Sequence, residues 1–499
     1  MAVTGENLNL FYKKGSRLII ITAIAGVTIL AAALVTMALD PIQLLINYNT
    51  RVTNNSFMFN MFQKEVEGAH LSLYVFNVTN AQEFMSGEDH SLNVQEVGPF
   101  TYAEIRQNID IDLDEEAGEL EFTPNMKLRF VPEQSVARPE DVIVTVPNLA
   151  LLSVASLVSS LPFFIRNTFK LLFSTLNCKS ITTIDVYSFL WGYSDPLISQ
   201  AYNIVPGIVY FDKFGIMDRL YDNKTIYRMR VGIRDEDRFS IKTLKKYMKS
   251  DNWMNERALE SYKYKNTYEG AAYPPGLNVE TPINIYRLGV CRELNLEFHG
   301  TKNMEYGGDA WIYRISNETF NRDCAAGVCG MMDLSSCTYG IPITMSRTHF
   351  LETDPKIYER IKGINPDPSK HDSHFLLEPN IGISLSTSLS LQMNMNLADL
   401  RFSDKTEMFS DLVLPVAYIK VVQQDVFDAL YGILRTIHVT APITLISIEV
   451  TMFLIAVAIL AYSGLLLYRR SKCKAKKKAY AKLNLRQNLP LIQCQLTKT

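Results

Sequence analysis

Leu18–Leu39 reads LIIITAIAGVTILAAALVTMAL, and Val450–Tyr468 reads VTMFLIAVAILAYSGLLLY. These two stretches decide the fold, because neither contains a charged residue and each is long enough, as a helix, to cross a bilayer. The 22 residues of the first stretch reach about 33 Å as a helix, and a hydrocarbon core is about 30 Å thick. The 19 residues of the second are just enough, and Glu449 lies at its outer end, where a carboxylate reaches the headgroups. The sequence therefore predicts two terminal transmembrane helices.

Basic residues flank both stretches on the sides that face the chain ends. Residues 1–17 carry a net charge of +2, and residues 469–499 contain ten basic residues and no acidic one. Because Lys and Arg near segment ends favour the cytoplasm, we expect both tails there and residues 40–449 outside. The alternative for the first stretch is a cleaved signal peptide. Its length and the lack of a clear small-x-small site after it favour an uncleaved anchor.

The net charge of the whole chain conceals the difference between the basic tails and the residues between them. The whole chain carries −2, and because the two tails together carry +12, residues 18–468 carry −14. An acidic ectodomain binds nucleic acid poorly, so we expect no nucleic-acid partner. The basic carboxyl-terminal tail is expected to set the topology and can also touch anionic lipid headgroups.

Five of the seven cysteines fall in the predicted ectodomain, where disulfides form. Four of them lie within residues 291–337, so we expect disulfides to cross-link that region. Cys178 is then either free and buried or in an unpredicted pairing. A zinc site is the rival interpretation, but the spacing C-x4-C-x7-C lacks paired C-x2-C units, so we expect no metal. Four sequons are compatible with N-glycosylation, although a similar number is expected by chance: Asn54, Asn77, Asn223 and Asn317.

Most of the ectodomain has the pattern of strands and turns. Val97–Arg106 alternates after a Gly-Pro turn, and residues 109–113 and 119–122 flank a hairpin loop that contains Gly118. In contrast, Lys242–Asp251 predicts a basic surface helix. Further alternating runs are Ile226–Ile233, Asn284–Val290, Ala310–Ile315, Ile383–Met395 and Leu412–Val422.

Leu149–Leu176 is apolar and helical in pattern. It overlaps an uncharged run, residues 142–165, so a third membrane span has to be considered. Pro147 and Pro162 leave only 14 residues between them, and a third span would place the basic tail outside. We therefore expect an apolar helical cluster within the ectodomain, either packed on itself or exposed to a lipid, a membrane or a partner.

Motifs that carry catalysis are absent from the sequence. It lacks G-x-S-x-G, H-E-x-x-H and G-x-x-x-x-G-K-[ST]. The acidic run Asp110–Asp114 has no glycine at the sixth position of a calcium loop, so we interpret it as part of a hairpin. His371 and His374 lie in a turn-rich loop, where solvated histidines are the default. We expect no enzyme activity, no cofactor and no metal site.

Several short motifs occur in a defined order along the chain. The most specific is Leu190–Leu197, which reads LWGYSDPL. The others are VGPFTY at Val97–Tyr102, Ile364-Asn-Pro366, Glu378-Pro379 with Gly382, and LPVAY at Leu414–Tyr418. Between two terminal anchors, these motifs resemble the class B scavenger receptor family over about residues 18–468. Its branches include fatty-acid translocases, lysosomal integral membrane proteins of type 2 and sensory neuron membrane proteins.

The resemblance implies an α+β membrane protein with one large ectodomain. It implies an antiparallel β-barrel-like core, a lipid tunnel, and a helical-bundle apex at about residues 149–176. It also implies the disulfides Cys291–Cys337 and Cys324–Cys329, the second as in the lysosomal branch. Some members place a ligand-contacting lysine shortly before the tryptophan motif; Lys179 is the nearest match, offset by a few residues, and a solvated loop lysine is the alternative. The candidate aromatic ligand contacts of the apex are Phe163, Phe164 and Phe169.

Two features of the carboxyl-terminal tail bear on location. Leu491 and Ile492 resemble the sorting signal of the lysosomal branch, but Gln487 stands where that signal has an acidic residue. Cys473, four residues past the second membrane segment, is a palmitoylation candidate, with a free thiol as the alternative. We expect the plasma membrane, with the lysosomal or endosomal membrane as the alternative.

Three functions are compatible with this reasoning. The first is a receptor that binds fatty acids, sterols or sterol esters, lipoprotein-like particles or apoptotic-cell surfaces at its apex and passes lipid through a tunnel to the membrane. Such transfer needs an apolar path and no nucleophile. The second is a sorting receptor that binds a luminal protein through its apex helices. A membrane-anchored ectoenzyme is the third, and the missing catalytic motifs disfavour it.

Overall fold

The computed structural model describes residues 5–204, 213–217, 225–248, 260–324, 329–338, 340–423 and 428–484. They divide into two compact units, which are described separately. The first unit comprises Met1–Leu45, Tyr306–Gly308 and Ala429–Thr499, and the second comprises Ile46–Glu305 and Asp309–Asp428.

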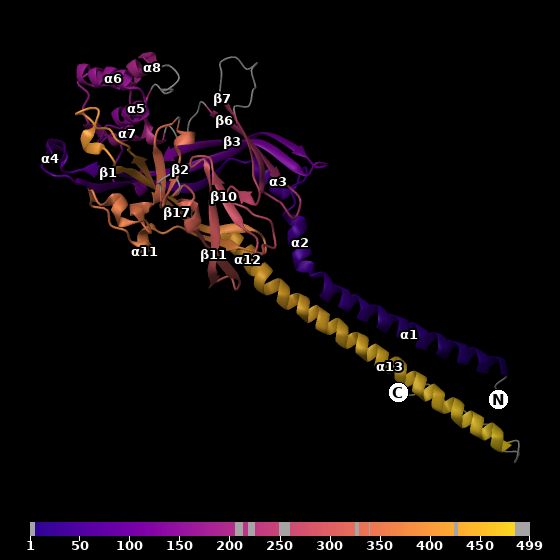
Figure 1. The fold of residues 1–499 in the computed structure, drawn as a ribbon. Coiled ribbons are helices and arrows are strands. Elements are labelled where there is room, and N and C mark those ends of the chain that lie inside the picture. The colour runs from indigo at the N-terminus through magenta and orange to yellow at the C-terminus, as the bar shows by residue number, and fades with distance from the viewer. Residues whose placement is uncertain are drawn as a thin grey trace. The chain divides into compact units, whose positions relative to one another are not determined.

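Two long apolar helices dominate the first unit: α1 (Gly5–Leu39) and α13 (Ala441–Asn484) (Figure 1). They contain the predicted segments 18–39 and 450–468, and both are long and apolar enough to cross a membrane. The helices pack antiparallel, since the Ser463 hydroxyl donates a hydrogen bond to the carbonyl of Ile19 at 3.2 Å and Gly26 lies against Leu460. Small residues at such contacts let transmembrane helices approach closely. The prediction of two terminal transmembrane helices is confirmed.

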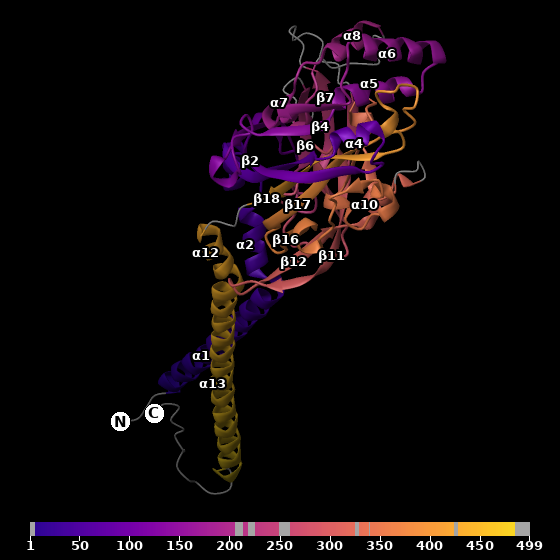
Figure 2. The same cartoon turned by 90° about the vertical axis from the view of Figure 1, so that its left-hand side faces the viewer.

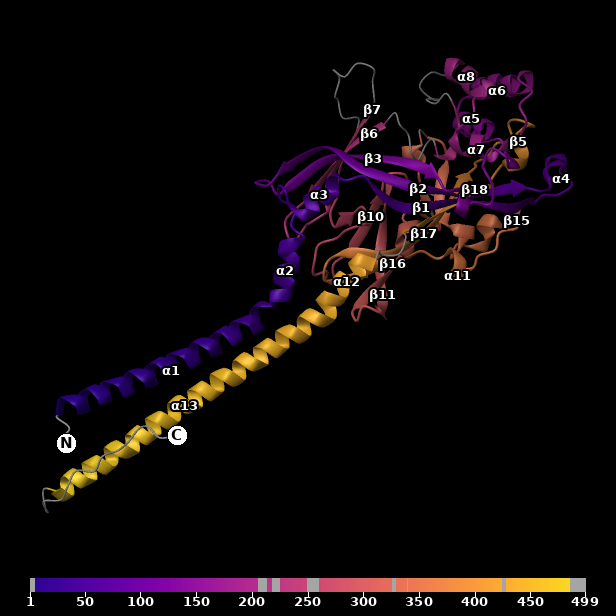
Figure 3. The same ribbon diagram turned by 180° about the vertical axis from the view of Figure 1, so that it is seen from behind.

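A large, mostly antiparallel sheet forms the body of the second unit. Among the described residues it has 16 strands, paired in the order β8-β7-β6-β3-β2-β1-β18-β17-β16-β12-β11-β10-β9, with β13, β14 and β15 attached at its sides. Figure 3 shows β1, β2, β3 and β18 side by side. The strands are β1 (Val66–Val78), β2 (Leu92–Asp114), β3 (Glu119–Phe130), β6 (Thr225–Gly232), β7 (Ile241–Met248), β8 (Glu260–Lys263), β9 (Thr267–Tyr268), β10 (Ile283–Arg287), β11 (Arg292–Asn303), β12 (Asp309–Ile315), β13 (Met331–Asp333), β14 (Ile343–Arg347), β15 (Ile361–Lys362), β16 (His374–Glu378), β17 (Ile383–Asn396) and β18 (Val413–Val422).

The two ends of this strand order are close together in sequence. Strand β8 ends at Lys263 and β9 begins at Thr267. Because consecutive Cα atoms are 3.8 Å apart, four steps span at most about 15 Å, so the sheet must curl until its first and last strands approach one another. This closure produces the barrel-like body that the family resemblance implies.

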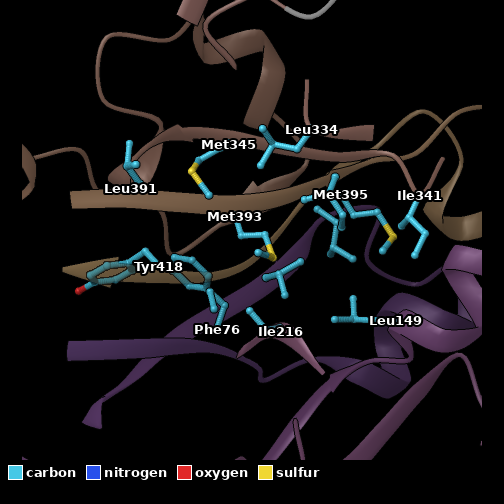
Figure 4. Close-up of a cluster of buried hydrophobic side chains, with 14 of the residues drawn as sticks. Phe76, Leu149, Ile216, Leu334, Ile341, Met345, Leu391, Met393, Met395 and Tyr418 are labelled. Atoms are coloured by element: carbon cyan, nitrogen blue, oxygen red, sulfur yellow. The ribbon is translucent and has the colours of Figure 1, made fainter. Parts of the chain in front are cut away.

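Strand β17 shows how the sequence pattern builds this body. Leu391, Met393 and Met395 alternate along the strand, and all three belong to the cluster of buried apolar side chains drawn in Figure 4. The polar residues of the other face are also buried, and they bond one another. The Gln392 amide donates to Asn394 at 2.7 Å, and Asn394 donates to the Ser346 hydroxyl of β14 at 2.9 Å. The strand predicted at Ile383–Met395 is confirmed, with both faces covered.

Helices gather at one end of the second unit (Figures 1 and 2). Helix α5 (Leu149–Ser159) has 11 residues, about 16 Å of helix, which is too short to cross a bilayer. It packs against α6 (Phe163–Thr175) and α8 (Pro196–Ile204), beside the small sheet of β4 (Ile143–Pro147) and β5 (Ile181–Asp185). The remaining helices are α2 (Pro41–Asn49), α3 (Phe57–Gln63), α4 (Ala81–Ser86), α7 (Val186–Trp191), α10 (Asn317–Asn321), α11 (Pro368–His371) and α12 (Asp428–Arg435).

Two expectations from the sequence are wrong. The predicted surface helix at Lys242–Asp251 is instead strand β7 over its described part, because pairing with β6 and β8 overrides its local helical propensity. His371 is not a solvated loop residue. Its side chain is buried against His349, 22 positions earlier in the chain, a contact that no local pattern could reveal.

Candidate functional site

A cavity of about 260 Å³ lies inside the second unit. Its apolar wall includes Leu149 at the start of α5, Ile216, Met393 of β17 and Val416 of β18. Figure 4 shows Leu149, Ile216 and Met393 pointing toward the same interior region. Ligand pockets usually measure about 300–1,000 Å³, so this cavity is near the lower end of that range. It can hold an apolar group of moderate size.

Four tyrosines and one lysine also line this cavity: Tyr227, Lys246, Tyr262, Tyr264 and Tyr286. Strand register brings them together. Tyr227 is paired with Lys246, and Leu244 with Tyr262, so these side chains share one face of the sheet. Tyr264 follows Tyr262 by two positions, and its ring lies 5.1 Å from that of Tyr286 on β10. Burial raises the pKa of Tyr264 to about 12, so its hydroxyl stays protonated at neutral pH.

The ionisable groups that line this cavity are three cations and one carboxylate: Lys246, Arg292, Arg322 and Glu293. Arg292 donates twice to the carbonyl of Asp333, at 3.0 and 2.6 Å, and Arg322 donates to the Asn295 amide oxygen at 2.9 Å. Glu293 accepts a hydrogen bond from the Thr267 hydroxyl at 2.5 Å. Both arginines therefore bond neutral oxygens, and the lining is net positive although residues 18–468 carry −14.

A second, smaller cavity of about 70 Å³ adjoins the first. The two share Tyr286, Leu288 and Gly289 as a common wall. The second is lined mainly by apolar strand residues, among them Leu389 and Ile419. The ion pair between Arg106 and Glu269 also borders it. The two cavities together form an interrupted hollow along the inside of the sheet.

Both disulfides implied by the resemblance are present in the structure. One joins Cys291 to Cys337, and both residues line the larger cavity. The other joins Cys324 to Cys329. Cys178 is a free, buried thiol, and burial raises its pKa to about 11. With four cysteines paired in this way, they have no thiolate to offer a zinc ion.

Helix α6 exposes apolar side chains. Phe163 and Phe164 are each 69% exposed, and Leu171 is 68% exposed. Phe169 is fully buried and packs against Phe173, with ring centroids 6.2 Å apart. The structure therefore gives Phe169 a packing position and leaves the other two predicted phenylalanines on the surface.

The charge around α6 is one-sided. Residues 142–184 contain Arg166, Lys170 and Lys179 and no carboxylate. Lys170 and Lys179 are exposed. The segment that contains α6 therefore combines exposed aromatic side chains with positive charge, although residues 18–468 as a whole carry −14.

The tryptophan motif LWGYSDPL, Leu190–Leu197, forms hydrogen bonds with the start of helix α5 and with strand β2. Asn148 caps α5 by accepting the Leu151 backbone N–H at 3.1 Å, and its amide donates to the carbonyl of Lys179 at 3.0 Å. The Tyr193 hydroxyl of the motif donates to the same Asn148 side chain at 3.4 Å, and Trp191 donates to Tyr102 at 3.1 Å. Through these hydrogen bonds the motif connects α5 to strand β2.

Two buried histidines stack elsewhere in the same unit. The rings of His349 and His371 are 4.3 Å apart and inclined by 4°. Each Nδ1 accepts a backbone N–H, from Asn365 at 3.0 Å and from Asp367 at 3.1 Å, while His349 Nε2 lies 3.1 Å from Glu96. Burial, and then the charge of His349, lowers the pKa of His371 to about 4. His371 is therefore neutral at physiological pH.

The remaining predicted positions are distributed as follows. Asn54 and Asn317 are exposed, Asn77 is half-buried, and Cys473 lies on α13. Asn223, Leu491 and Ile492 lie outside the described residues. Glycosylation, palmitoylation and sorting at these positions stay predictions.

The tyrosines and the lysine that line the cavity were not predicted from the sequence. Its members are spread over residues 227–286, and only the pair Tyr262 and Tyr264 shows a local signal, the two-residue period of a strand face. The others meet through the register of β6, β7 and β8 and through the curl of the sheet.

Comparison with known proteins places the chain in a family. The CD36 family profile matches residues 20–467. Lysosome membrane protein 2 of Mus musculus is 25% identical over 466 residues, which cover 89% of this chain and 93% of that protein. Scavenger receptor class B member 1 of Bos taurus is 25% identical over 388 residues, which cover 74% and 73% of the two chains. The profile spans both apolar helices and the whole sheet, and the chain therefore belongs to the CD36 family of membrane receptors.

Proposed function

We propose that this receptor binds lipid or lipid-bearing particles at the α5–α8 end of its ectodomain and passes single lipid molecules through the interior cavities toward the membrane. CD36-family receptors are non-enzymatic and generally bind lipids or lipoproteins. The observation that carries the proposal is the larger cavity, whose apolar wall begins at the first residue of α5, Leu149. Removing an acyl or sterol body from water is favourable at about 25 cal/mol per Å², so a dry apolar path is sufficient to guide it.

The surface of α6 supports docking at this end. Phe163, Phe164 and Leu171 offer exposed apolar area, and the neighbouring Lys170 and Lys179 favour anionic groups such as phospholipid headgroups. The basic flanks of both membrane helices support cytoplasmic termini, and thus an ectodomain that faces the cell exterior or an organelle lumen. We propose the plasma membrane as its main location.

Blocking the cavity tests the proposal. Met393→Trp fills the interior wall, and Val136→Trp, at a residue 57% exposed, is a matched surface control. With equal amounts of receptor at the cell surface, Met393→Trp should abolish uptake of a fluorescent fatty acid or sterol ester, and the control should not. Mass spectrometry of the purified wild type should find bound lipid. Unchanged uptake by Met393→Trp would contradict the proposal.

A second candidate function is sorting of a luminal protein. It is favoured by the apolar face of α6, since a 13-residue helix with Phe163, Phe164 and Leu171 exposed can pack against a partner helix. The similarity to Lysosome membrane protein 2 is compatible with a lysosomal or endosomal location. Purification from detergent separates the two functions. A stoichiometric soluble protein, lost on changing Phe163 and Phe164 to Ala, would favour sorting, whereas bound lipid favours transfer.

A further inference from the structure

Helix α2 (Pro41–Asn49) begins where the membrane helix α1 ends. The apolar span of α1 runs to Leu39, and Asp40 is the single residue between the two helices. Asp40 has φ +42°, and a residue in the left-handed region cannot continue a right-handed helix. Its carboxylate accepts the backbone N–H of Gln43 at 3.2 Å and so caps α2. Helix α2 is therefore a separate helix that starts at the membrane boundary.

One face of α2 is apolar and exposed. The sequence of the helix, PIQLLINYN, contains no charged residue. At about 100° of rotation per residue, the side chains of Leu44, Leu45 and Tyr48 fall within one arc of about 100°. Their exposed fractions are 54%, 62% and 69%. Exposed apolar side chains that gather on one face in this way mark an interaction surface.

The opposite face of the same helix packs within the second unit. Ile46 is only 7% exposed. Thr50, one turn later, accepts a hydrogen bond from the fully buried guanidinium of Arg238. On the helical wheel Ile46 and Thr50 lie opposite Leu44 and Tyr48, because two residues of separation amount to about 200° of rotation. The exposed face therefore points away from the residues that pack against α2 in that unit.

We propose that the face of α2 formed by Leu44, Leu45 and Tyr48 lies in the phospholipid leaflet at the ectodomain end of α1. The bilayer is the partner because α2 follows the transmembrane span after one residue, so its first turn lies at the membrane boundary. Interfacial helices bury such a face about 5–10 Å into the region between headgroups and acyl chains. The leucines contact acyl chains there, and a tyrosine keeps its hydroxyl among the headgroups. Since α2 has no charge, the contact requires no anionic lipid, and it does not depend on the proposed lipid transfer.

The test uses Tyr48→Trp in the full-length receptor, in phosphatidylcholine nanodiscs that hold one receptor each. Bromine on an acyl chain quenches tryptophan fluorescence on contact, and the emission of the introduced tryptophan is the difference between the variant and the wild type in the same lipid. Bromine near the top of the acyl chain should reduce that emission by about twofold or more, and bromine near its end should reduce it less, because the helix lies at the boundary. The quenching should be equal at low and high salt. Val136→Trp, at a residue 57% exposed in the second unit, is the matched control and should not be quenched.

A second variant tests whether the apolar face is responsible. Leu44→Gln together with Leu45→Gln, added to Tyr48→Trp, should restore most of the lost emission. Guanidinium unfolding of the ectodomain should stay as in the wild type, because both leucines are exposed. Quenching that survives the two glutamines, equal quenching of the Val136→Trp control, or stronger quenching by the deep bromine would overturn the proposal. An unquenched Tyr48→Trp would overturn it as well, and is the result expected if a second receptor or a soluble protein covers this face instead.

Discussion

The two disulfides of the ectodomain should differ measurably in their contribution to stability. Cys291 and Cys337 are 46 positions apart, whereas Cys324 and Cys329 are 5 apart. In the chain-entropy model a cross-link stabilises by restricting the unfolded chain, and the effect grows with the logarithm of the closed loop. That model gives about 4 kcal/mol for the longer loop and about 2 kcal/mol for the shorter one at 25 °C.

The assay uses the full-length receptor in nanodiscs with either cysteine pair changed to Ser. All three tryptophans, Trp191, Trp253 and Trp311, lie between the two membrane segments, so their fluorescence reports ectodomain unfolding by guanidinium without a signal from the helices. The variant without the 291–337 bridge should lose about twice as much unfolding free energy as the variant without the 324–329 bridge.

The longer bridge also carries a second expectation. Cys291 and Cys337 line the larger cavity, so their loss should reduce lipid uptake, whereas loss of Cys324 and Cys329 should not. Equal destabilisation by the two variants, or a larger loss from the shorter loop, would refute the loop-entropy reasoning. Unchanged uptake without the longer bridge would show that the cavity wall does not depend on it.

Three further predictions concern single residues. Phe169→Ala should destabilise the ectodomain by about 3–5 kcal/mol in guanidinium unfolding, as for other buried Phe truncations. Phe163 is exposed, so Phe163→Ala should leave the unfolding free energy nearly unchanged and weaken binding to lipid vesicles. Similar stabilities of the two variants would contradict this assignment. The pKa of His371 is lowered to about 4, so the unfolded chain binds more protons than the folded one below about pH 6.5, and stability should fall by up to about 3 kcal/mol as the pH drops from 6.5 to 4. His371→Gln should flatten that pH profile, and an equally steep profile would exclude His371 as its source. Gly382 has φ +78°, and an added Cβ would lie 2.4 Å from the carbonyl oxygens of Tyr273 and Pro274, so Gly382→Ala should sharply reduce the amount of folded receptor at the cell surface, and wild-type amounts would refute the close approach.

Sequence reasoning was most successful where the physical cause is local. An uncharged run such as Leu18–Leu39 has to be shielded from water along its whole length, whatever the rest of the chain does, and its basic flank predicts a cytoplasmic amino terminus. The two-residue period of Ile383–Met395 specifies a strand in the same way. The prolines that bound the apolar run at 147 and 162 were sufficient to reject a third span.

The sequence was misleading where long-range pairing decides the outcome. Lys242–Asp251 has no local feature that prevents a helix, yet its described part is a strand because β6 and β8 supply hydrogen-bond partners on both sides. Phe169 resembles Phe163 in sequence context. Phe169 is buried because it lies on the face of α6 that also carries the buried Phe173, whereas Phe163 is exposed.

By itself, then, the sequence determined the two anchors, the acidic ectodomain between basic tails, the cysteine-rich segment and the order of motifs typical of one receptor family. Only the tertiary structure decided the cavity and the polar side chains that line it. The reason is that Tyr227, Lys246, Tyr264 and Tyr286 come from separate strands, and their convergence depends on register and on the curl that brings β8 back to β10. The register and the curvature are properties of the assembled sheet, and no single segment of the sequence contains them.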